Sequence, residues 1–445
     1  MSIENLLSLS WIKIYKMMRL FLLISSAFFC LLTLPVIAQV NTADILDVSK
    51  LEPLYQPKQM SLEAFEKLSA VLTREPSEGD PFSYQIRVPK DWLVTLDNNL
   101  KYEVVGGQTI GTIAEYISPE HPKGRARIIV RSDPTFRDVY MKDMFLAQAL
   151  ADGTSIRSVE DKDNLEVEAE YVKQLEGRAV VYRGRSFIHG PRNIYVEFVS
   201  PIRRYLEFKD LQAHVINSFE ILSEPTEELE DRRVFAFLNK AKLSYPEGLV
   251  LTSQRVFSIN HVSARFLNLD LSDFPNGTIR FDMYRKDPGF DWEKQLAQTK
   301  EEFSNEDQRV SEVIEEKDYE TDESVKLHEA KIYGIRTRLS RFEIDKLGKV
   351  KNELLIAYLE DDEFNYIASV LTPTRQDNLI EWSRNMRAFE IMAQSLQKIP
   401  EPDIFPPKET PNEGTEPEID PERDAQAEFP DLLHKLDEES SEDSN

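Results

Sequence analysis

The side chains best placed to do chemistry are a group of arginines in the first half of the chain. The stretch from residue 173 to residue 204 holds only two acids, Glu176 and Glu197, against six arginines: Arg178, Arg183, Arg185, Arg192, Arg203 and Arg204. Alternate residues of a strand point to the same face, so Arg183 and Arg185 are expected on one side of a sheet. Such a surface would bind an anionic partner, lipid head groups or an acidic segment of the same chain. The alternative is a solvated sheet face without a ligand.

Patterns that indicate catalysis or metal binding are missing from the sequence. The histidines are far apart and none has a partner four residues away, as in a zinc motif. There is no GxSxG elbow, Walker loop, GxGxxG or HExxH motif. We therefore expect no catalytic residues, no metal and no cofactor. A hydrolase whose residues meet only in the fold is the enzymatic alternative.

The composition limits the class of protein. Of 445 residues, 79 are acidic and 54 basic, which gives a net charge of −25, and 41% are hydrophobic. The apolar fraction is sufficient for packed cores, while 30% charged residues exclude a polytopic membrane protein. Because the excess negative charge repels phosphates, no nucleic-acid partner is expected.

The N-terminus is typical of an export signal. Basic residues up to Arg19 precede an apolar run over residues 20–34, and Pro35 breaks the run before Val36-Ile37-Ala38. We predict a signal peptide over residues 1–38, with translation starting at Met1, Met17 or Met18. An uncleaved anchor is the alternative, since residues 20–38 approach the length of a membrane span. The protein is thus expected in the periplasm or at the cell surface of a bacterium. Cys30, the single cysteine, lies within the signal.

The C-terminal segment, residues 399–445, is predicted to be disordered. Residues 401–445 contain 16 acids and 3 bases, so they carry −13 of the −25 charge, and they are rich in proline. One part has apolar residues at helical spacing, a candidate docking helix formed by Phe429, Leu432, Leu433 and Leu436. A fraying helix without a partner is the alternative.

Between signal and tail, the sequence divides into two similar domains. We predict an N-terminal extension over residues 39–79 with an amphipathic helix at 61–72, a first domain over 80–222, a linker over 223–233 and a second domain over 234–398. Both domains begin with a strand, a proline and a turn, at 82–92 and 243–249.

The order of the predicted elements also repeats. A strand (126–130 or 278–283) precedes a helix (142–151 or 292–303), an antiparallel ribbon (178–199 or 335–359) and a further strand (204–208 or 365–371). Each copy closes on a helix, and residues 217–222, NSFEIL, match residues 387–392, RAFEIM. The sequence therefore indicates an internal duplication.

The strand that ends in a turn before Trp92, the middle helix, and the closing helix before Ser218-Phe219 together resemble the PsbP-like superfamily. The second copy departs from this pattern, with Leu249 in place of the tryptophan and Ala388 in place of the serine. The resemblance implies an α/β (α+β) fold of two tandem antiparallel-sheet sandwich domains with helices on both faces. It also implies a non-catalytic binding or assembly protein.

Two functional hypotheses follow. The first is a non-enzymatic envelope protein that binds a protein partner or assists the assembly of a membrane-associated complex, with contact to a membrane surface as a further option. The second is a carrier of a small ligand or lipid in the cleft between sheet and helix of one copy.

Overall fold

The computed structural model describes residues 50–75, 83–96, 101–105, 108–135, 137–175, 177–225, 227–269, 275–304, 308–338 and 347–400. The predicted signal peptide, most of the predicted tail, and the predicted docking helix with Phe429, Leu432, Leu433 and Leu436 lie outside these ranges. Within them, no helix is long and apolar enough to cross a membrane.

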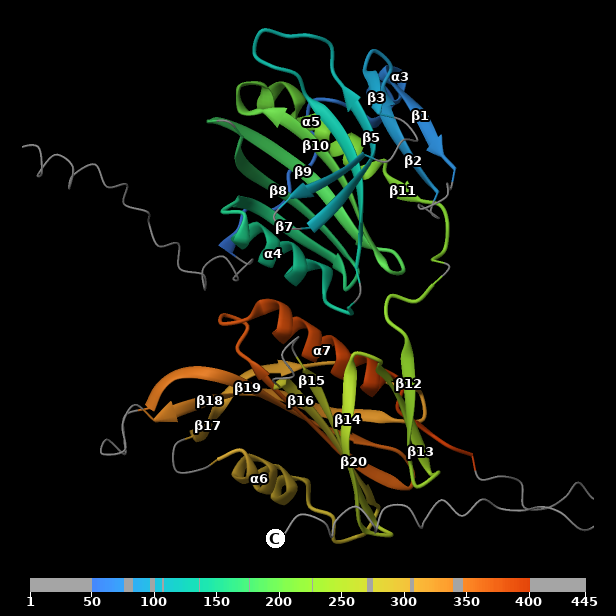
Figure 1. Cartoon of the computed structure of the whole chain (residues 1–445), viewed down its shortest axis with the longest axis vertical. Helices are drawn as coiled ribbons and strands as arrows, with labels where there is room; N and C mark the ends of the chain where they lie inside the picture. Colours follow the sequence, from blue (N-terminus) through green and yellow to red (C-terminus); the bar gives the residue numbers. More distant parts are fainter. Residues whose placement is uncertain are drawn as a thin grey trace, which may run out of the picture. The chain divides into compact units, whose positions relative to one another are not determined.

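The first domain combines a small sheet with a large one, and their described strand pairs are antiparallel (Figure 1). The small sheet has the order β1 (Ser69–Arg74), β2 (Tyr84–Pro89), β11 (Glu220–Ile221). The large sheet has the order β3 (Leu93–Leu96), β5 (Gln108–Ile117), β6 (Arg127–Pro134), β10 (Arg192–Pro201), β9 (Arg178–Ile188), β8 (Glu166–Leu175), β7 (Ser155–Asp163), and β4 (Lys101–Val105) also pairs with β5.

Alternation along the strands gives the large sheet two buried faces. Ile128 and Val130 of β6 pack toward α5 (Tyr205–Asn217), which follows the short helix η2 (Ile202–Arg204). Ile129 lies on the other face and packs with α4 (Met141–Ala151). Phe65 of α3 (Leu62–Leu68) joins the α5 side. Each face is thus covered by a helix, as the fold class predicted from the sequence requires.

The second domain repeats this plan. Its small sheet is β12 (Arg232–Phe237), β13 (Ala241–Pro246), β21 (Gln397–Lys398), and its large sheet is β14 (Leu249–Ser258), β15 (His261–Leu269), β16 (Pro275–Arg285), β20 (Phe364–Pro373), β19 (Leu347–Glu360), β18 (Lys326–Arg338), β17 (Gln308–Lys317). Figure 1 shows α6 (Trp292–Glu302) and α7 (Leu379–Gln394) on opposite faces of the large sheet. The matching strand orders confirm two tandem domains.

The predicted strand at 204–208 is wrong, because Arg204 ends η2 and α5 begins at Tyr205. Tyr205 and Phe208 are buried, as are Val215 and Ile216 later in the helix, which is the spacing of a helix that packs one face. By strand order, the ribbon β9–β10 corresponds to β19–β20. The sequence had matched residues 178–199 with residues 335–359, which form β18 and β19, so that match was wrong by one strand. The predicted helix at 61–72 is also shorter, because Ser69 Oγ donates to Phe65 O at 2.7 Å and the chain continues as β1.

The end of each copy shows a second displacement. Ser218 Oγ accepts a hydrogen bond from Arg87 N at 2.9 Å, which ties the end of α5 to β2. In the second copy, Ser395 Oγ accepts from Ser244 N of β13 at 2.9 Å. The structural equivalent of Ser218 is therefore Ser395, not Ala388 as the sequence alignment suggested, and the serine is present in both copies.

Polar and apolar contacts join α4 of the first domain to the second domain. Arg375 Nη2 donates to Asp143 Oδ1 at 2.7 Å, and Tyr140 N donates to Ser383 Oγ at 2.9 Å. Leu379 of α7 belongs to the apolar cluster under α4. The helix α4 is thus packed between its own sheet and α7.

Candidate functional site

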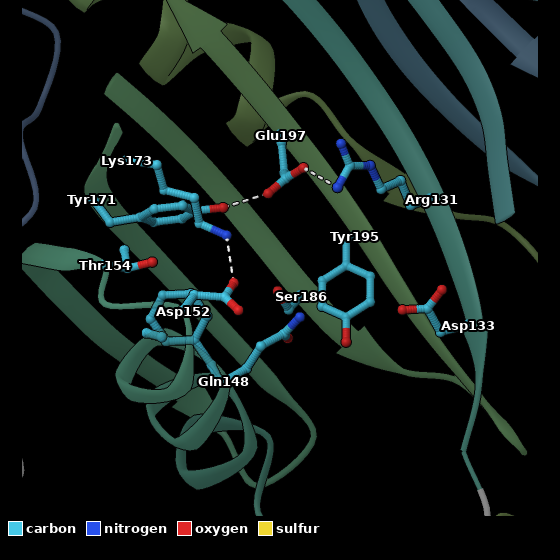
Figure 2. Close-up of a pocket in the computed structure, with 12 residues that line it drawn as sticks. Arg131, Asp133, Gln148, Asp152, Thr154, Tyr171, Lys173, Ser186, Tyr195 and Glu197 are labelled. Carbon is cyan, nitrogen blue, oxygen red and sulfur yellow. Dashed lines mark hydrogen bonds and ion pairs between the residues drawn. The ribbon is translucent and has the colours of Figure 1, made fainter. Parts of the chain in front are cut away.

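A small polar cavity lies between α4 and the large sheet of the first domain. Its lining includes neighbouring sheet positions Arg131 and Asp133 on β6, Tyr171 and Lys173 on β8, Ser186 on β9, and Tyr195 and Glu197 on β10. The helix side contributes Phe145, Gln148, Ala149, Asp152 and Thr154 (Figure 2). The side chains from sheet and helix point toward one another across the cavity.

Glu197 is the buried anion of this cavity. It accepts a hydrogen bond from the Tyr171 hydroxyl and ion-pairs with Arg131 Nη1 at 3.5 Å. The carboxylate of Glu197 raises the pKa of the Arg131 guanidinium, and burial and Glu197 together raise the pKa of Tyr171. Gly184 lies opposite Glu197 on β9, and a Cβ there would lie 3.3 Å from Glu197 Cγ. The glycine leaves room for the acid.

Asp133 is the second acid that lines the cavity. Burial raises its pKa to about 6, although the charge of Arg131 and a backbone hydrogen bond from Gly111 oppose the shift. Its Oδ1 has no hydrogen-bond partner among the described residues, and the same is true of Thr154 Oγ1. Buried polar atoms without partners are uncommon, so this cavity is suited to a polar guest or ordered water.

The rim of the cavity is held by a further ion pair. Lys173 Nζ donates to Asp152 Oδ2 at 2.9 Å, just after the end of α4. The ring of Tyr171 stacks on Tyr182 with 5.0 Å between centroids. These contacts fix the walls, so the polar groups are preorganised.

The size of the cavity limits its contents. The space in which the centre of a water molecule can lie is about 50 Å³. One water needs roughly 10–15 Å³ by this measure. The cavity therefore accommodates a few waters or a small polar group, whereas a site for a drug-sized ligand occupies about 300–1,000 Å³. A lipid does not fit.

The corresponding layer of the second domain lies under α6. The face under α6 is filled by apolar residues, among them Ile335, Leu354 and Ile356, with Trp292 and Leu296 of the helix against them. The two copies thus share a fold and differ in the chemistry of the same layer.

The cavity does not support the hydrolase alternative. Ser186 and three acids, Asp133, Asp152 and Glu197, lie in it, but no histidine lines it among the described residues. No group of three His, Cys, Asp or Glu side chains suited to a metal ion occurs in the described part of the chain.

The structure corrects the expectation that Arg183 belongs to an exposed basic surface. Arg183 and Arg185 both bond to β8, but Arg183 is 1% exposed. Its Nη2 donates to Glu168 at 2.6 Å, and its Nη1 donates to Tyr55 O at 2.6 Å. Arg185 donates to Glu166 and to Phe219 O. Because β8 supplies a glutamate for each arginine, these two residues anchor the fold.

The register separates the other predicted arginines. Arg178 is the first residue of β9, and Arg203 follows the end of β10. Because Pro201 at the end of β10 pairs with Val180 near the start of β9, Arg178 and Arg203 lie at the same end of the sheet. Arg204 lies there too and donates to Glu207 at 2.9 Å. Arg192 lies at the opposite end, where it donates to Ser132 at 3.4 Å. Binding of an anionic partner at the end with Arg178, Arg203 and Arg204 stays a prediction.

A wider groove lies beside the small sheet of the first domain. It has a volume of about 770 Å³ and is lined by Pro57, Leu62, Phe65, Val71, Gln85, Ile86, Arg87, His214, Asn217, Ser218, Phe219 and Glu220. Leu62 is 60% and Val71 48% exposed. β1 is an edge of its sheet, so one side of this strand has no strand partner among the described residues.

The segment before α3 contributes Pro57 to this groove and is tied to α5. Asp210 accepts hydrogen bonds from Tyr55 Oη at 2.7 Å and from Met60 N at 2.5 Å. Burial acts to raise the pKa of Asp210, but these hydrogen bonds outweigh it and hold the pKa below its ordinary value. Residues 55–60 are thus positioned by one buried carboxylate.

The sequence interpretation missed the cavity and the groove. Their residues are single polar or apolar side chains on separate strands and helices, which converge only in the fold. The sequence does contain one signal, the alternation of Glu166, Glu168 and Glu170 one strand before Arg183 and Arg185. These acids lie before residue 173, outside the stretch in which the arginines are concentrated.

Comparison with known proteins gives similarities of structure only. No family model matches the chain, and no curated protein matches it in sequence. Among solved structures, CyanoP, the cyanobacterial PsbP protein of Synechocystis, is 13% identical, with 38% of this chain and 99% of CyanoP covered and a TM-score of 0.25.

Two further solved structures, of proteins with different printed descriptions, are also similar to this chain. LpqN of Mycobacterium tuberculosis, described as involved in cell envelope biogenesis, is 12% identical over 38% of this chain and 99% of LpqN, with a TM-score of 0.23. The T6SS immunity protein TplEi of Pseudomonas aeruginosa is 8% identical over 74% of this chain and 97% of its own, with a TM-score of 0.18. The fold assignment rests on this chain's own strand order and register.

Proposed function

We propose that this chain is a non-enzymatic, exported protein of a bacterial envelope that binds a protein partner through the groove beside the small sheet of its first domain. The observation that carries the proposal is the exposure of Leu62 and Val71 in a groove of about 770 Å³. Export is inferred from the basic residues and the apolar run near the N-terminus.

The lining of the groove is suited to a protein segment. Protein interfaces have an apolar centre and a polar rim. Leu62 and Val71 supply apolar contacts, while Gln85, Arg87 and Asn217 supply hydrogen-bonding groups at the same site. The edge of β1 offers backbone groups to an extended partner segment.

The test compares partner recovery after crosslinking in cells, with the tagged chain purified from envelope fractions. The double substitution Leu62→Ser and Val71→Ser should reduce the recovered partner by roughly tenfold, since hot-spot truncation costs more than about 1–2 kcal/mol. Leu206→Ser is the matched control, because Leu206 is exposed but does not line the groove. If the wild type, the double variant and Leu206→Ser recover equal amounts of partner, the groove is not the binding site.

A second candidate function is binding of a small polar ligand in the cavity under α4. It is favoured by the unpaired atoms of Asp133 and Thr154 that line the cavity. Native mass spectrometry of protein taken from its own envelope should then detect a small added mass that is lost in Thr154→Val. A wild-type mass equal to that of the chain alone would contradict ligand binding in the cavity.

A further inference from the structure

The hairpin of β14 and β15 in the second domain ends in exposed apolar side chains. Ser258 pairs with His261, so Ile259 and Asn260 form the turn. Ile259 is 81% exposed and Phe257 is 58% exposed, and Val256 is also exposed. Apolar residues gathered at a projecting tip indicate a contact with another surface.

Behind this tip lies a pocket with three arginines. It has a volume of about 240 Å³ and is lined by Ser253, Arg255, Phe257, Ser263, Arg265, Arg280 and Glu302. The register brings these residues together, since Arg265 lies opposite Ser253 on β14 and opposite Arg280 on β16. Arg255 lies opposite Ser263.

Two of the three guanidinium groups are available to an external anion. Arg280 Nε lies 2.6 Å from Asp282 Oδ2, and Arg280 also pairs with Glu302. Arg255 and Arg265 are exposed, and within the described residues neither pairs with a carboxylate. Residues 249–269 contain both arginines and no acid, in a chain of net charge −25. The hairpin is thus a local basic surface on an acidic protein.

The exposed aromatic residue of the tip is held in place. The ring of Phe257 stacks on His261 with 4.5 Å between centroids, and His261 stacks on Tyr284 at 4.1 Å. Tyr284 packs in turn against the cluster under α6. A rigid aromatic side chain loses less conformational entropy when it binds.

We propose that this hairpin docks on a membrane surface that contains anionic lipids. Ile259 and Phe257 enter the interfacial layer, and Arg255 and Arg265 bind head-group phosphates. The order of the residues supports a membrane over a protein partner, because the apolar side chains lie at the tip and the cationic ones behind it. This matches the order of acyl chains and phosphates in a leaflet. The proposal is independent of the groove in the first domain.

The test measures sedimentation of the exported full chain with vesicles of phosphatidylcholine alone or mixed with phosphatidylglycerol. Binding should require phosphatidylglycerol. The double substitution Arg255→Gln and Arg265→Gln should reduce the partition coefficient by about 30-fold, which corresponds to two basic contacts. Phe257→Ser with Ile259→Ser should reduce it by a similar factor on the same vesicles.

Two controls separate this surface from others. Val313→Ser with Ile314→Ser removes exposed apolar residues from β17 and should leave binding unchanged. Lys326→Gln with Lys351→Gln removes exposed basic residues from β18 and β19 and should also leave it unchanged. Loss of binding in either control, with the hairpin variants unaffected, would overturn the proposal.

A third measurement distinguishes a lipid surface from a free anion. If glycerol phosphate binds the pocket in solution while vesicles do not sediment the protein, the pocket recognises a soluble phosphate and the membrane proposal is wrong. Vesicle binding that persists in excess glycerol phosphate but is lost in Phe257→Ser with Ile259→Ser would support it. Partner recovery through the groove is scored separately, so either proposal can fail alone.

Discussion

Single buried carboxylates give the first domain its specific chemistry. Glu197 has a tyrosine and an arginine as partners, whereas Asp133 has one oxygen without a hydrogen bond among the described residues. The ordinary pKa of Asp133 is 3.8 and its value in the fold is about 6. The folded state therefore holds the proton more tightly than the unfolded chain does.

The difference between the folded and unfolded pKa of Asp133 determines how the free energy of unfolding changes with pH. The contribution of Asp133 to stability is fully present below pH 3.8 and is lost as the pH rises through about 6. The full shift corresponds to about 3 kcal/mol, and solvent screening reduces the expected effect to about 1–2 kcal/mol. Above pH 6 the ionised side chain destabilises the fold by a constant amount.

Asp133→Asn should remove this dependence. The variant cannot ionise, so its free energy of unfolding relative to wild type should be higher at pH 7.5 than at pH 4.5 by about 1–2 kcal/mol. Urea denaturation at both pH values measures the difference. Asp91→Asn, at an exposed position, controls for the change in net charge. An equal difference at the two pH values would contradict the assigned role of Asp133.

Some helices of this chain were predicted closely from the sequence, whereas several strands were missed. The helices at 142–151 and 292–303 were predicted within one residue because their apolar spacing and flanking turns are strong local signals. The strands β7 and β8 were missed, and residues 204–208 were assigned to a strand instead of α5. Short apolar stretches fit both a strand and a helix, and tertiary packing decides between them.

The site was less predictable than the fold for the same reason. Arg183 and Arg185 were correctly placed on one strand, but their glutamate partners come from β8, which the sequence interpretation did not recognise. Arg183 also binds Tyr55 O, more than a hundred residues away. Contacts of this kind depend on the register of the whole sheet.

Arg183→Gln tests whether Arg183 anchors β9 to β8 and to the segment that contains Tyr55. The substitution leaves the carboxylate of Glu168 buried without its guanidinium, which is expected to lower the free energy of unfolding by about 3–5 kcal/mol. It should also increase hydrogen exchange in residues 55–60. Arg178→Gln is the matched control on the same strand, and because Arg178 is exposed a change within about 0.5 kcal/mol is expected. Similar stability of both variants would show that the pair is not an anchor.

At the scale of the whole molecule, the two copies have diverged in chemistry while keeping one plan. The layer under α4 holds a polar cavity beside its apolar cluster, whereas the residues packed under α6 form an apolar cluster. The available basic hairpin belongs to the second copy and the wide groove to the first. Because the groove lies on the first copy and the hairpin on the second, the tandem arrangement allows a single chain to hold a partner with one domain and a membrane with the other, as we propose.

The contacts of α4 with the second domain predict that the two domains unfold together. Asp143 is buried on α4, and Arg375 of the second domain is its ion-pair partner at 2.7 Å. Wild-type protein should therefore unfold in one calorimetric transition. Arg375→Gln leaves Asp143 without its cation and should separate the transition into two, with the first domain less stable by about 3–5 kcal/mol.

A double-mutant cycle with Asp143→Asn isolates the contact itself. The double variant removes both charges and should recover part of the lost stability, with a coupling energy of about 0.5–3 kcal/mol. Arg233→Gln is the control, since Arg233 pairs with Glu247 on the surface of the second domain. A coupling energy near zero, with one transition kept in Arg375→Gln, would mean that this pair does not join the domains. The linkage would then rest on the apolar contact of Leu379 with the cluster under α4.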